Sequence, residues 1–327
     1  MLDAIALLAL QMVAQSCVVA DEPAAKFLPE AGAGWRQIRA EIANCRGDAT
    51  QVHEAVVPDA KDQEFTVEHS FNARDGNFLY RSKGIAGSTA GIEYVDAYNS
   101  AYAFRLKENY GDFAITDISE SKASVVADIE KQRVAFMPIM VVTEPVDWLA
   151  AQPGFAARDV TLDSEGGRPV SRISFSYGKG PREDFKLLDG TIWFLPENLW
   201  AIKRFEVRIQ YADGIGVARG VTEYDLSHGP LPLPVKHTCD FYDENAKEPY
   251  IRQSFAFSDV GPGTVREEDC MLSAFGLPES AANAVVRRPR LILYLLLSGV
   301  LLFALAVALR YGARRWANRR DTAEAAQ

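Results

Sequence analysis

The four histidines, His53, His69, His228 and His237, are the residues best suited to chemistry, because imidazole is a common acid–base catalyst and metal ligand near neutral pH. None belongs to an H-E-x-x-H or H-x-H pattern or to a cluster with cysteine, so a metal site would have to assemble from distant strands. His69 lies on the apolar face of its segment. That position favours a buried histidine bonded to a backbone carbonyl, with contact to a ligand as the alternative. The histidines therefore predict no metal site.

Two further patterns come near to motifs of phosphate or ion binding without matching them. The run Gly84–Gly91, GIAGSTAG, has the spacing of neither a dinucleotide-binding loop nor a phosphate loop, and Ser88 is not in a G-x-S-x-G context. The acidic run at 267–269 lacks the alternating spacing of a calcium loop. No motif places a nucleophile near a base. We therefore expect no catalytic residue and no cofactor, and the chain is predicted not to be an enzyme.

The four cysteines, Cys17, Cys45, Cys239 and Cys270, form no C-x-x-C pair, so neither a zinc site nor a dithiol redox site is indicated. If the N-terminal segment is removed as a signal, three remain, and at most one intramolecular disulfide can form. Cys239 and Cys270 flank the last expected strands, which are candidates for neighbours in a sheet. We predict that these two pair, with a bridge from Cys45 to either as the alternative.

The charge of the chain disfavours a nucleic-acid partner. Its 327 residues carry a formal net charge of −9, and the arginines after residue 286 leave the preceding part more acidic still. An acidic domain repels phosphate backbones and anionic lipid surfaces alike. No internal repeat and no linker rich in proline, glycine or serine divides this part, so either one large β domain or two smaller ones would fit its length.

Alternation with a period of two residues predicts that most of the chain is β-strand. In residues 65–71 large side chains alternate with polar ones, and Asp75-Gly76 follows as a hairpin turn. About ten to twelve such segments are expected, each with one apolar face. These faces are expected to line the interior of a curved sheet, and the predicted ligand-binding residues on them are Phe65, Val67, His69, Tyr102, Phe104, Phe175, Phe205, Val207 and Phe255.

Helical periodicity interrupts the strands twice. Trp35, Ile38 and Ile42 share one face of a helix expected to end at Gly47, and residues 125–136 fit a second helix that Pro138 interrupts. Strands with one apolar face must form a sandwich or a bent, partly closed barrel, and a helical insert favours the barrel. The predicted class is mainly β (α+β): a curved antiparallel sheet or half-open β-barrel with an N-terminal helix and a mid-chain helical lid.

Two apolar segments predict a membrane protein. Leu291–Leu309 has no charged residue over a length of about 28 Å, enough to span a bilayer, and the heavier arginine cluster follows it, which places the C-terminus in the cytoplasm. Residues 1–20 resemble a cleavable signal, with an uncleaved N-terminal anchor as the alternative because the start lacks a basic residue. The expected order is a signal at 1–20, an extracytoplasmic β domain at 21–284, a transmembrane helix with its flanks at 285–310 and a basic cytoplasmic tail at 311–327.

One hairpin carries a resemblance to a known family. The segment Gly190–Asp213, GTIWFLPENLWAIKRFEVRIQYAD, has an aromatic strand, a Leu-Pro-Glu-Asn turn and a long amphipathic return strand. It resembles the corresponding hairpin of the lipoprotein-carrier superfamily (LolA/LolB-like). The resemblance implies an unclosed antiparallel barrel with an N-terminal helix and mid-chain helices over an apolar cavity. The carriers are soluble or lipid-anchored, whereas this chain is expected to be fixed by a helix, and their functional arginine has no counterpart that can be placed here.

Two functions follow from these expectations. In the first, a membrane-anchored periplasmic module at the bacterial inner membrane holds a lipid, acyl chain or other apolar ligand in a half-barrel cavity, because burial of each CH₂ is worth about 0.8 kcal/mol. In the second, the barrel is filled by its own side chains, and the domain is an envelope sensor or meets a protein partner. A catalytic role is the weakest of the three alternatives, since no acid, base or nucleophile set stands out.

The predicted topology can be tested with single cysteines on the two sides of the apolar segment. Ala323→Cys should resist a membrane-impermeant thiol reagent in intact cells, because the tail is expected in the cytoplasm. Ser280→Cys serves as the accessible control. Equal labelling rates at the two positions would reverse the orientation.

Overall fold

The structure is a computed structural model that describes residues 22–57, 63–109, 111–119, 134–177, 186–211, 214–227, 229 and 231–279. The signal at 1–20, the apolar segment Leu291–Leu309 and the tail lie outside these residues. Among the described residues, none forms a helix that is both long and apolar enough to cross a bilayer.

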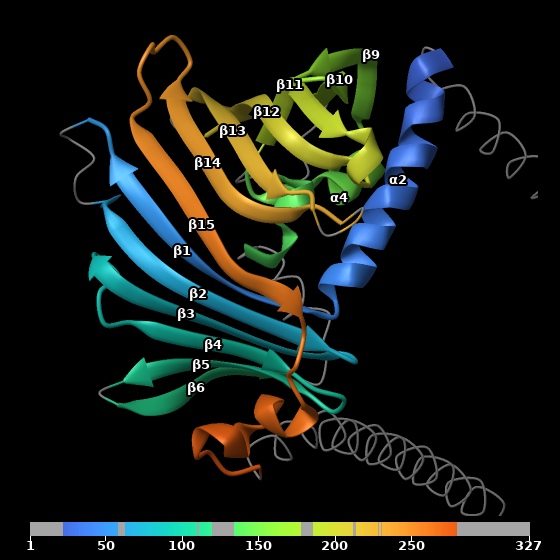
Figure 1. The fold of residues 1–327 in the computed structure, drawn as a ribbon. Helices are drawn as coiled ribbons and strands as arrows, with labels where there is room; N and C mark the ends of the chain where they lie inside the picture. The colour runs from blue at the N-terminus through green and yellow to red at the C-terminus, as the bar shows by residue number, and fades with distance from the viewer. Residues whose placement is uncertain are drawn as a thin grey trace, which may run out of the picture.

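One large antiparallel sheet contains almost all of the described strands, and every strand pairs with its neighbour in an antiparallel register (Figure 1). The two halves of the chain meet where β1 pairs with β15. In spatial order the strands are β6 (Asp112–Ser119), β5 (Ala103–Asn109), β4 (Glu93–Tyr98), β3 (Asn77–Gly87), β2 (Phe65–Arg74), β1 (Cys45–Ala55), β15 (Ile251–Pro262), β14 (Leu233–Asp243), β13 (Ile215–Asp225), β12 (Ala201–Gln210), β11 (Lys186–Leu195), β10 (Arg168–Tyr177) and β9 (Phe155–Glu165).

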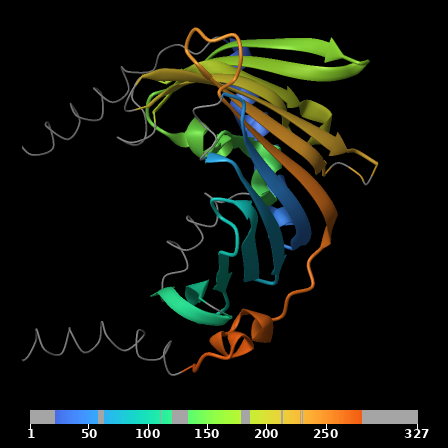
Figure 2. The same ribbon diagram turned by 90° about the vertical axis from the view of Figure 1, so that its left-hand side faces the viewer.

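The sheet curls strongly but does not close, because its outermost strands β6 and β9 do not pair with each other. Figure 2 shows the resulting open curve, with helical pieces inside it. The predicted half-open antiparallel sheet is confirmed, with slightly more strands than the sequence indicates.

Helix α2 (Glu22–Ile42) packs on the inner face of the sheet at the β9–β12 end (Figure 1). It starts earlier and ends earlier than the sequence indicates, since strand β1 has begun by Gly47. There is no room for a side chain at Gly47, where an added Cβ would lie 2.8 Å from the ring of Phe71. This position therefore needs glycine for a close strand contact rather than to end a helix.

The helix is held by the turn of the aromatic hairpin. The indole Nε1 of Trp35 donates to the backbone oxygen of Trp200 at 3.0 Å. Leu199 and Trp200 both have positive φ, at 58° and 59°, an unusual conformation for bulky residues. Gly34 lies beneath this turn, where an added Cβ would be 2.5 Å from the Leu199 oxygen. Helix and turn thus fit each other only at this close approach.

A set of short elements lies inside the curve next to α2. They are η2 (Val134–Ile139), β7 (Met140–Val141), β8 (Glu144–Pro145) and α4 (Val146–Ala151). Arg39 of α2 binds Asp147 of α4 through two hydrogen bonds, at 2.5 Å and 3.0 Å. Most of the predicted mid-chain helix lies outside the described residues; the part described is a 3-10 turn that contains Pro138.

The main core fills the half of the curve beneath α2. Its members come from α2, η2, α4 and the inner faces of β10–β14. Phe205 of β12 is only 2% exposed, and its ring covers Gly220 on the neighbouring strand, where an added Cβ would lie 2.3 Å from ring atoms. This half of the barrel is therefore filled by close-packed side chains.

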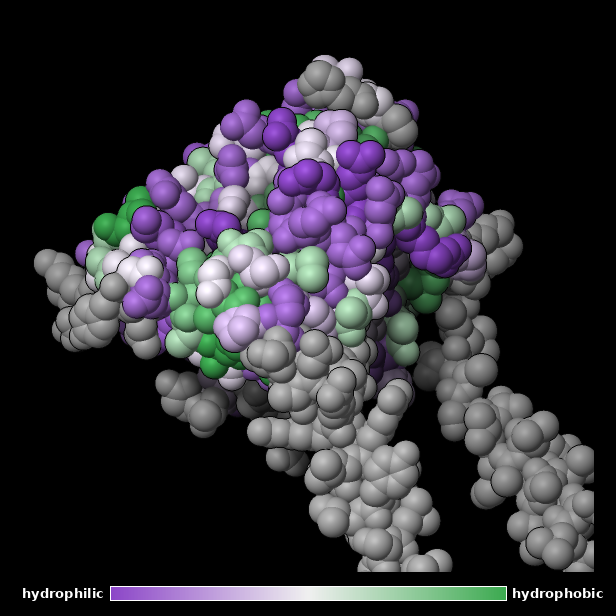
Figure 3. All heavy atoms as spheres, turned by 90° about the horizontal axis from the view of Figure 1, so that it is seen from below, coloured by the Kyte–Doolittle hydropathy of each residue, from purple (hydrophilic) through white to green (hydrophobic). Residues whose placement is uncertain are grey.

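A separate core lies on the outer face of β3–β6, where η4 (Glu267–Cys270) and η5 (Leu272–Phe275) cover the sheet. Tyr102 and Phe104 belong to this outer core, so their predicted inward orientation is wrong. Arg105 of the same strand lies on the inner face and binds Asp96 at 2.6 Å. The alternation of side chains along β5 does not show which face is the inner one, because both faces of this strand are buried. Seen from below, this end of the molecule presents hydrophilic residues around a smaller hydrophobic group (Figure 3).

The described cysteines are free thiols, and the predicted pair Cys239–Cys270 is not formed. Cys239 lies on the inner face of β14 in the main core, whereas Cys270 lies in the outer core. The Cys270 thiol donates to the Phe78 oxygen at 3.3 Å, and burial raises its pKa to about 12. The two cysteines flank the last strand in sequence, but the chain crosses to the other face of the sheet between them.

Phe205→Ala should lower the free energy of unfolding by about 3–5 kcal/mol, because the ring lies in a packed core and not beside an existing void. A residue lining a cavity, which is how the sequence places Phe205, would cost only about 1–2 kcal/mol. Urea melts of the purified protein measure the loss. Leu162→Ala, at a side chain that is 76% exposed, is the control and should change stability by about 0.5 kcal/mol or less. A loss near that of the control would contradict the packed core.

Candidate functional site

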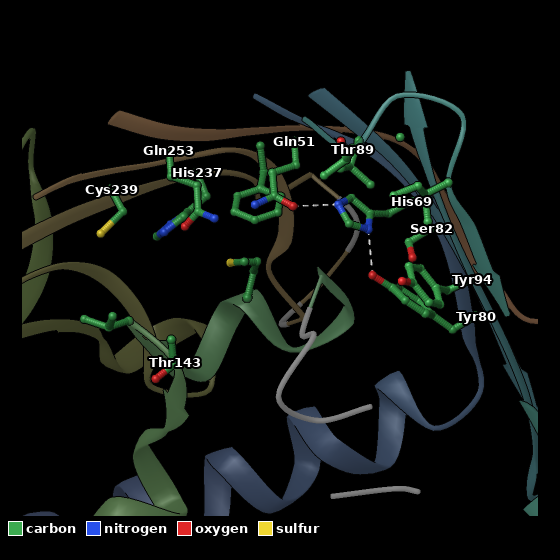
Figure 4. Close-up of a pocket in the computed structure, with 16 residues that line it drawn as sticks. Gln51, His69, Tyr80, Ser82, Thr89, Tyr94, Thr143, His237, Cys239 and Gln253 are labelled. Atoms are coloured by element: carbon green, nitrogen blue, oxygen red, sulfur yellow. Dashed lines mark hydrogen bonds between the residues drawn. The ribbon is translucent and has the colours of Figure 1, made fainter. Parts of the chain in front are cut away.

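The inner face of the sheet leaves a cavity of about 420 Å³ next to the packed half. It lies against β1–β4, β14 and β15, and is bounded on the other side by η2 and the turn between β7 and β8 (Figure 4). This volume falls within the range of small-molecule sites. The lining residues are Gln51, Val67, His69, Tyr80, Ser82, Gly84, Thr89, Ile92, Tyr94, Met137, Val142, Thr143, His237, Cys239, Gln253 and Phe255.

The nine predicted ligand-binding residues divide among four environments. Those that line the cavity, as predicted, are Val67, His69 and Phe255. Those that face inward but belong to the packed core are Phe175, Phe205 and Val207. Phe65 faces inward and stacks on His53, with ring centroids 4.6 Å apart, outside the cavity lining. Tyr102 and Phe104 lie on the outer face.

His69 is the polar group of the cavity lining whose two ring nitrogens both have hydrogen-bond partners in Figure 4. Its Nε2 lies 2.8 Å from Gln51 Oε1, which can only accept, so Nε2 carries the proton and donates. In the neutral ring Nδ1 then accepts from the Tyr80 hydroxyl at 2.6 Å. His69 is buried, as predicted, but its partners are two side chains and not a backbone carbonyl.

His237 occupies the opposite side of Phe255 from His69. The ring centroid of Phe255 lies 6.1 Å from that of each histidine. His237 Nδ1 lies 2.9 Å from the hydroxyl of Thr222. Burial lowers the pKa of both histidines to about 4, so both imidazoles are neutral at pH 7. The site therefore presents hydrogen-bonding groups without histidine charge.

The sequence missed most of the polar lining for a physical reason. The inner face of β1 carries Ala49, Gln51 and His53, so the sequence shows no apolar alternation there. β1 is nevertheless a full strand of the sheet and pairs with β2 along most of its length. Gln253 occupies the same inner face of β15, two residues before Phe255. The available signal is the two-residue period, which places Gln253 on the same face of its strand as Phe255.

The chemistry of this arrangement is hydrogen bonding and apolar contact. Both nitrogens of His69 are engaged and its pKa is far below 7, so it is poorly suited to be a general base. Burial raises the pKa of the Cys239 thiol, which disfavours the reactive thiolate. Within the described ranges, no three His, Cys, Asp or Glu side chains are grouped so as to hold a metal ion.

Acid should destabilise the fold through His69 and His237. Their folded-state pKa of about 4 lies below the unfolded value of 6.5, so the unfolded chain binds protons that the folded chain does not as pH falls between these values. The free energy of unfolding is undiminished by this effect above about pH 6.5. By pH 5, protonation in the unfolded chain should have lowered it by about 2 kcal/mol for each histidine. Urea melts at several pH values measure this loss. His69→Gln should flatten the dependence, and a slope equal to that of the parent would contradict it.

No protein-family model and no curated protein matches this chain. Solved structures are similar to it in fold at low sequence identity. A DUF1329 family protein from Desulfovibrio piger is 8% identical, with 77% of this chain and 99% of that chain covered and a TM-score of 0.45. LprF from Mycobacterium bovis is 10% identical, with 73% and 96% covered and a TM-score of 0.29.

A third solved structure is the LolA superfamily protein NE2245 from Nitrosomonas europaea. It is 9% identical, with 76% of this chain and 97% of that chain covered and a TM-score of 0.40.

Proposed function

We propose that this chain is a binding module that holds an amphiphile, with an acyl chain or another apolar group, in the cavity beside η2. The observation that carries the proposal is the cavity itself, which lies where the packed half of the curved sheet gives way to the open half. Its apolar walls are Val67, Ile92, Met137, Val142 and Phe255. Burial of an apolar group against them supplies the affinity, at about 25 cal/mol for each Å² removed from water.

The composition of the wall suits a ligand with two different ends. Met137 reaches the cavity from η2, and its unbranched side chain can adapt to an irregular apolar group. Gln51, His69 and Tyr80 lie on the facing sheet and present fixed polar groups. A purely hydrocarbon ligand would leave the lining side chains of Ser82, Tyr94 and Gln253, which make no hydrogen bond among the described residues, without a partner, so the ligand carries a polar group as well.

The cellular setting of the proposal rests on the sequence. The export signal at 1–20 and the apolar segment Leu291–Leu309 support a single-pass inner-membrane protein whose β domain is periplasmic. A domain tethered in this way holds or senses its ligand at the membrane and does not carry it across the periplasm. The role is one of binding and not catalysis, in keeping with the neutral, fully engaged His69.

A second candidate is an envelope sensor or protein-interaction domain, and the packed core beneath α2 favours it. Half of the curve is filled by its own side chains, with Phe205 and Ile192 almost fully buried. In that function the outer surface or the free edge strands meet a partner. The two candidates differ in whether the cavity itself is occupied.

Filling the cavity should abolish ligand binding without unfolding the protein. Ser82→Phe places a ring in the cavity from β3 and should reduce binding of an uncharged solvatochromic dye by at least about tenfold, because the dye loses its contact area. Fluorescence titration measures the affinity, and native mass spectrometry looks for a lipid that copurifies.

The matched control is Ser254→Phe on β15, whose side chain points to the outer face between the inward Gln253 and Phe255. It should bind the dye as the parent does. A parent that binds neither dye nor lipid would favour the interaction domain.

A further inference from the structure

The described lining of the cavity contains no formal charge. None of its sixteen residues is Asp, Glu, Lys or Arg (Figure 4). Its two histidines, His69 and His237, are each hydrogen-bonded within the wall and neutral at physiological pH. A ligand enclosed here therefore meets neither a cation nor an anion from these residues.

Two charges of the inner face, Asp96 and Arg105, neutralise one another, and a third, Lys107 of β5, lies outside the lining with its Nζ 5.6 Å from the ring centroid of Tyr94. Asp96 of β4 faces Tyr80 across the strand pair and has no exposed surface. Arg105 of β5 binds it through two hydrogen bonds, from Nε at 2.6 Å and from Nη2 at 3.3 Å. Because the guanidinium is engaged with this carboxylate, it is not available as a counterion for a ligand in the cavity.

Neutral hydrogen-bonding groups, by contrast, are available in the wall. In the described part of the chain, the side chains of Ser82, Tyr94 and Gln253 make no hydrogen bond to another residue, although all three line the cavity. Two hydroxyls and one amide can both donate and accept. Ser82 of β3 and Tyr94 of β4 are paired neighbours, whereas Gln253 of β15 lies beyond β1 and β2, so the neutral groups occupy two separate places on the wall.

We propose that the cavity selects an amphiphile whose polar group is uncharged, such as a hydroxyl, ester or amide, over one that carries a carboxylate or phosphate. This inference rests on the proposed function, since it names the class of ligand for the same site. An anionic group taken into the cavity loses its hydration and gains no cation from the described lining in return. A hydroxyl or ester exchanges water for Ser82, Tyr94 and Gln253 at little cost.

The test compares two amphiphiles with the same acyl chain, a monoacylglycerol and the corresponding fatty acid, below their micelle concentrations at pH 8. Each competes with the uncharged dye on the full-length protein. We expect the monoacylglycerol to bind at least tenfold more tightly than the ionised acid. If the acid binds equally well or better, the charge selectivity is wrong while the binding function stands. If neither displaces the dye and no lipid copurifies, the binding function itself is wrong.

A charge-introducing pair of variants tests the same inference in the opposite direction. Gln253→Arg places a cation in the cavity and should raise affinity for the ionised acid at least tenfold relative to the parent. Ser254→Arg places the same charge one residue along on the outer face of β15, and it should leave the ligand preference unchanged. An identical preference in the parent and in a folded, dye-binding Gln253→Arg variant would overturn the proposal.

Discussion

The docking of α2 against one half of the curved sheet is the constraint on which the rest of the structure depends. A curled antiparallel sheet has a concave apolar face that must be covered, and α2 covers only the β9–β12 end of it. The aromatic rings of Phe27, Trp35, Phe194 and Trp200 meet there, at centroid distances between 5.2 Å and 6.4 Å. The positive-φ turn at Leu199 and Trp200 is an unusual backbone that persists because the helix overdetermines it.

The position of the helix decides where a ligand can bind. Because α2 and α4 fill one half, the remaining concavity falls at β1–β4, β14 and β15, where η2 reaches across from the packed core. The salt bridge between Arg39 and Asp147 joins α4 to the helix, and through the short β7–β8 hairpin it helps to fix the turn that bounds the cavity. The apolar core and the polar cavity are therefore adjacent compartments of one concave face.

The sequence predicted the parts of the fold in which one physical pattern dominates. Strands β2 and β12 alternate cleanly because each has one buried and one exposed face, and the hairpin turn at Asp75-Gly76 is encoded by local backbone preferences. It failed where burial no longer distinguishes the faces. Phe104 lies on the outer face and Arg105 on the inner face because η4 and η5 cover the outer surface of this strand. Such coverage by a segment distant in sequence leaves no local trace.

The candidate site was predictable only in part for a related reason. His69 and Phe255 lie on recognisable strands, whereas Gln51 and Gln253 interrupt the apolar pattern and so look like solvent-facing residues. Polar residues on a concave face are recognisable only once the register is known. The cysteines show the same limit, since Cys239 and Cys270 flank one strand but lie on opposite faces of the sheet.

The pairing of β1 with β15 has a consequence for the order of folding. Most strands pair with a neighbour in sequence, but this seam joins residues about two hundred positions apart, such as Cys45 and Pro262. Closing so long a loop carries a large entropic cost, and non-local pairings of this kind form slowly. The cavity lies across the seam, so its walls come together only after the last strand has been added. We therefore expect the ligand site to be the last feature of the domain to mature, and a chain still folding to be empty.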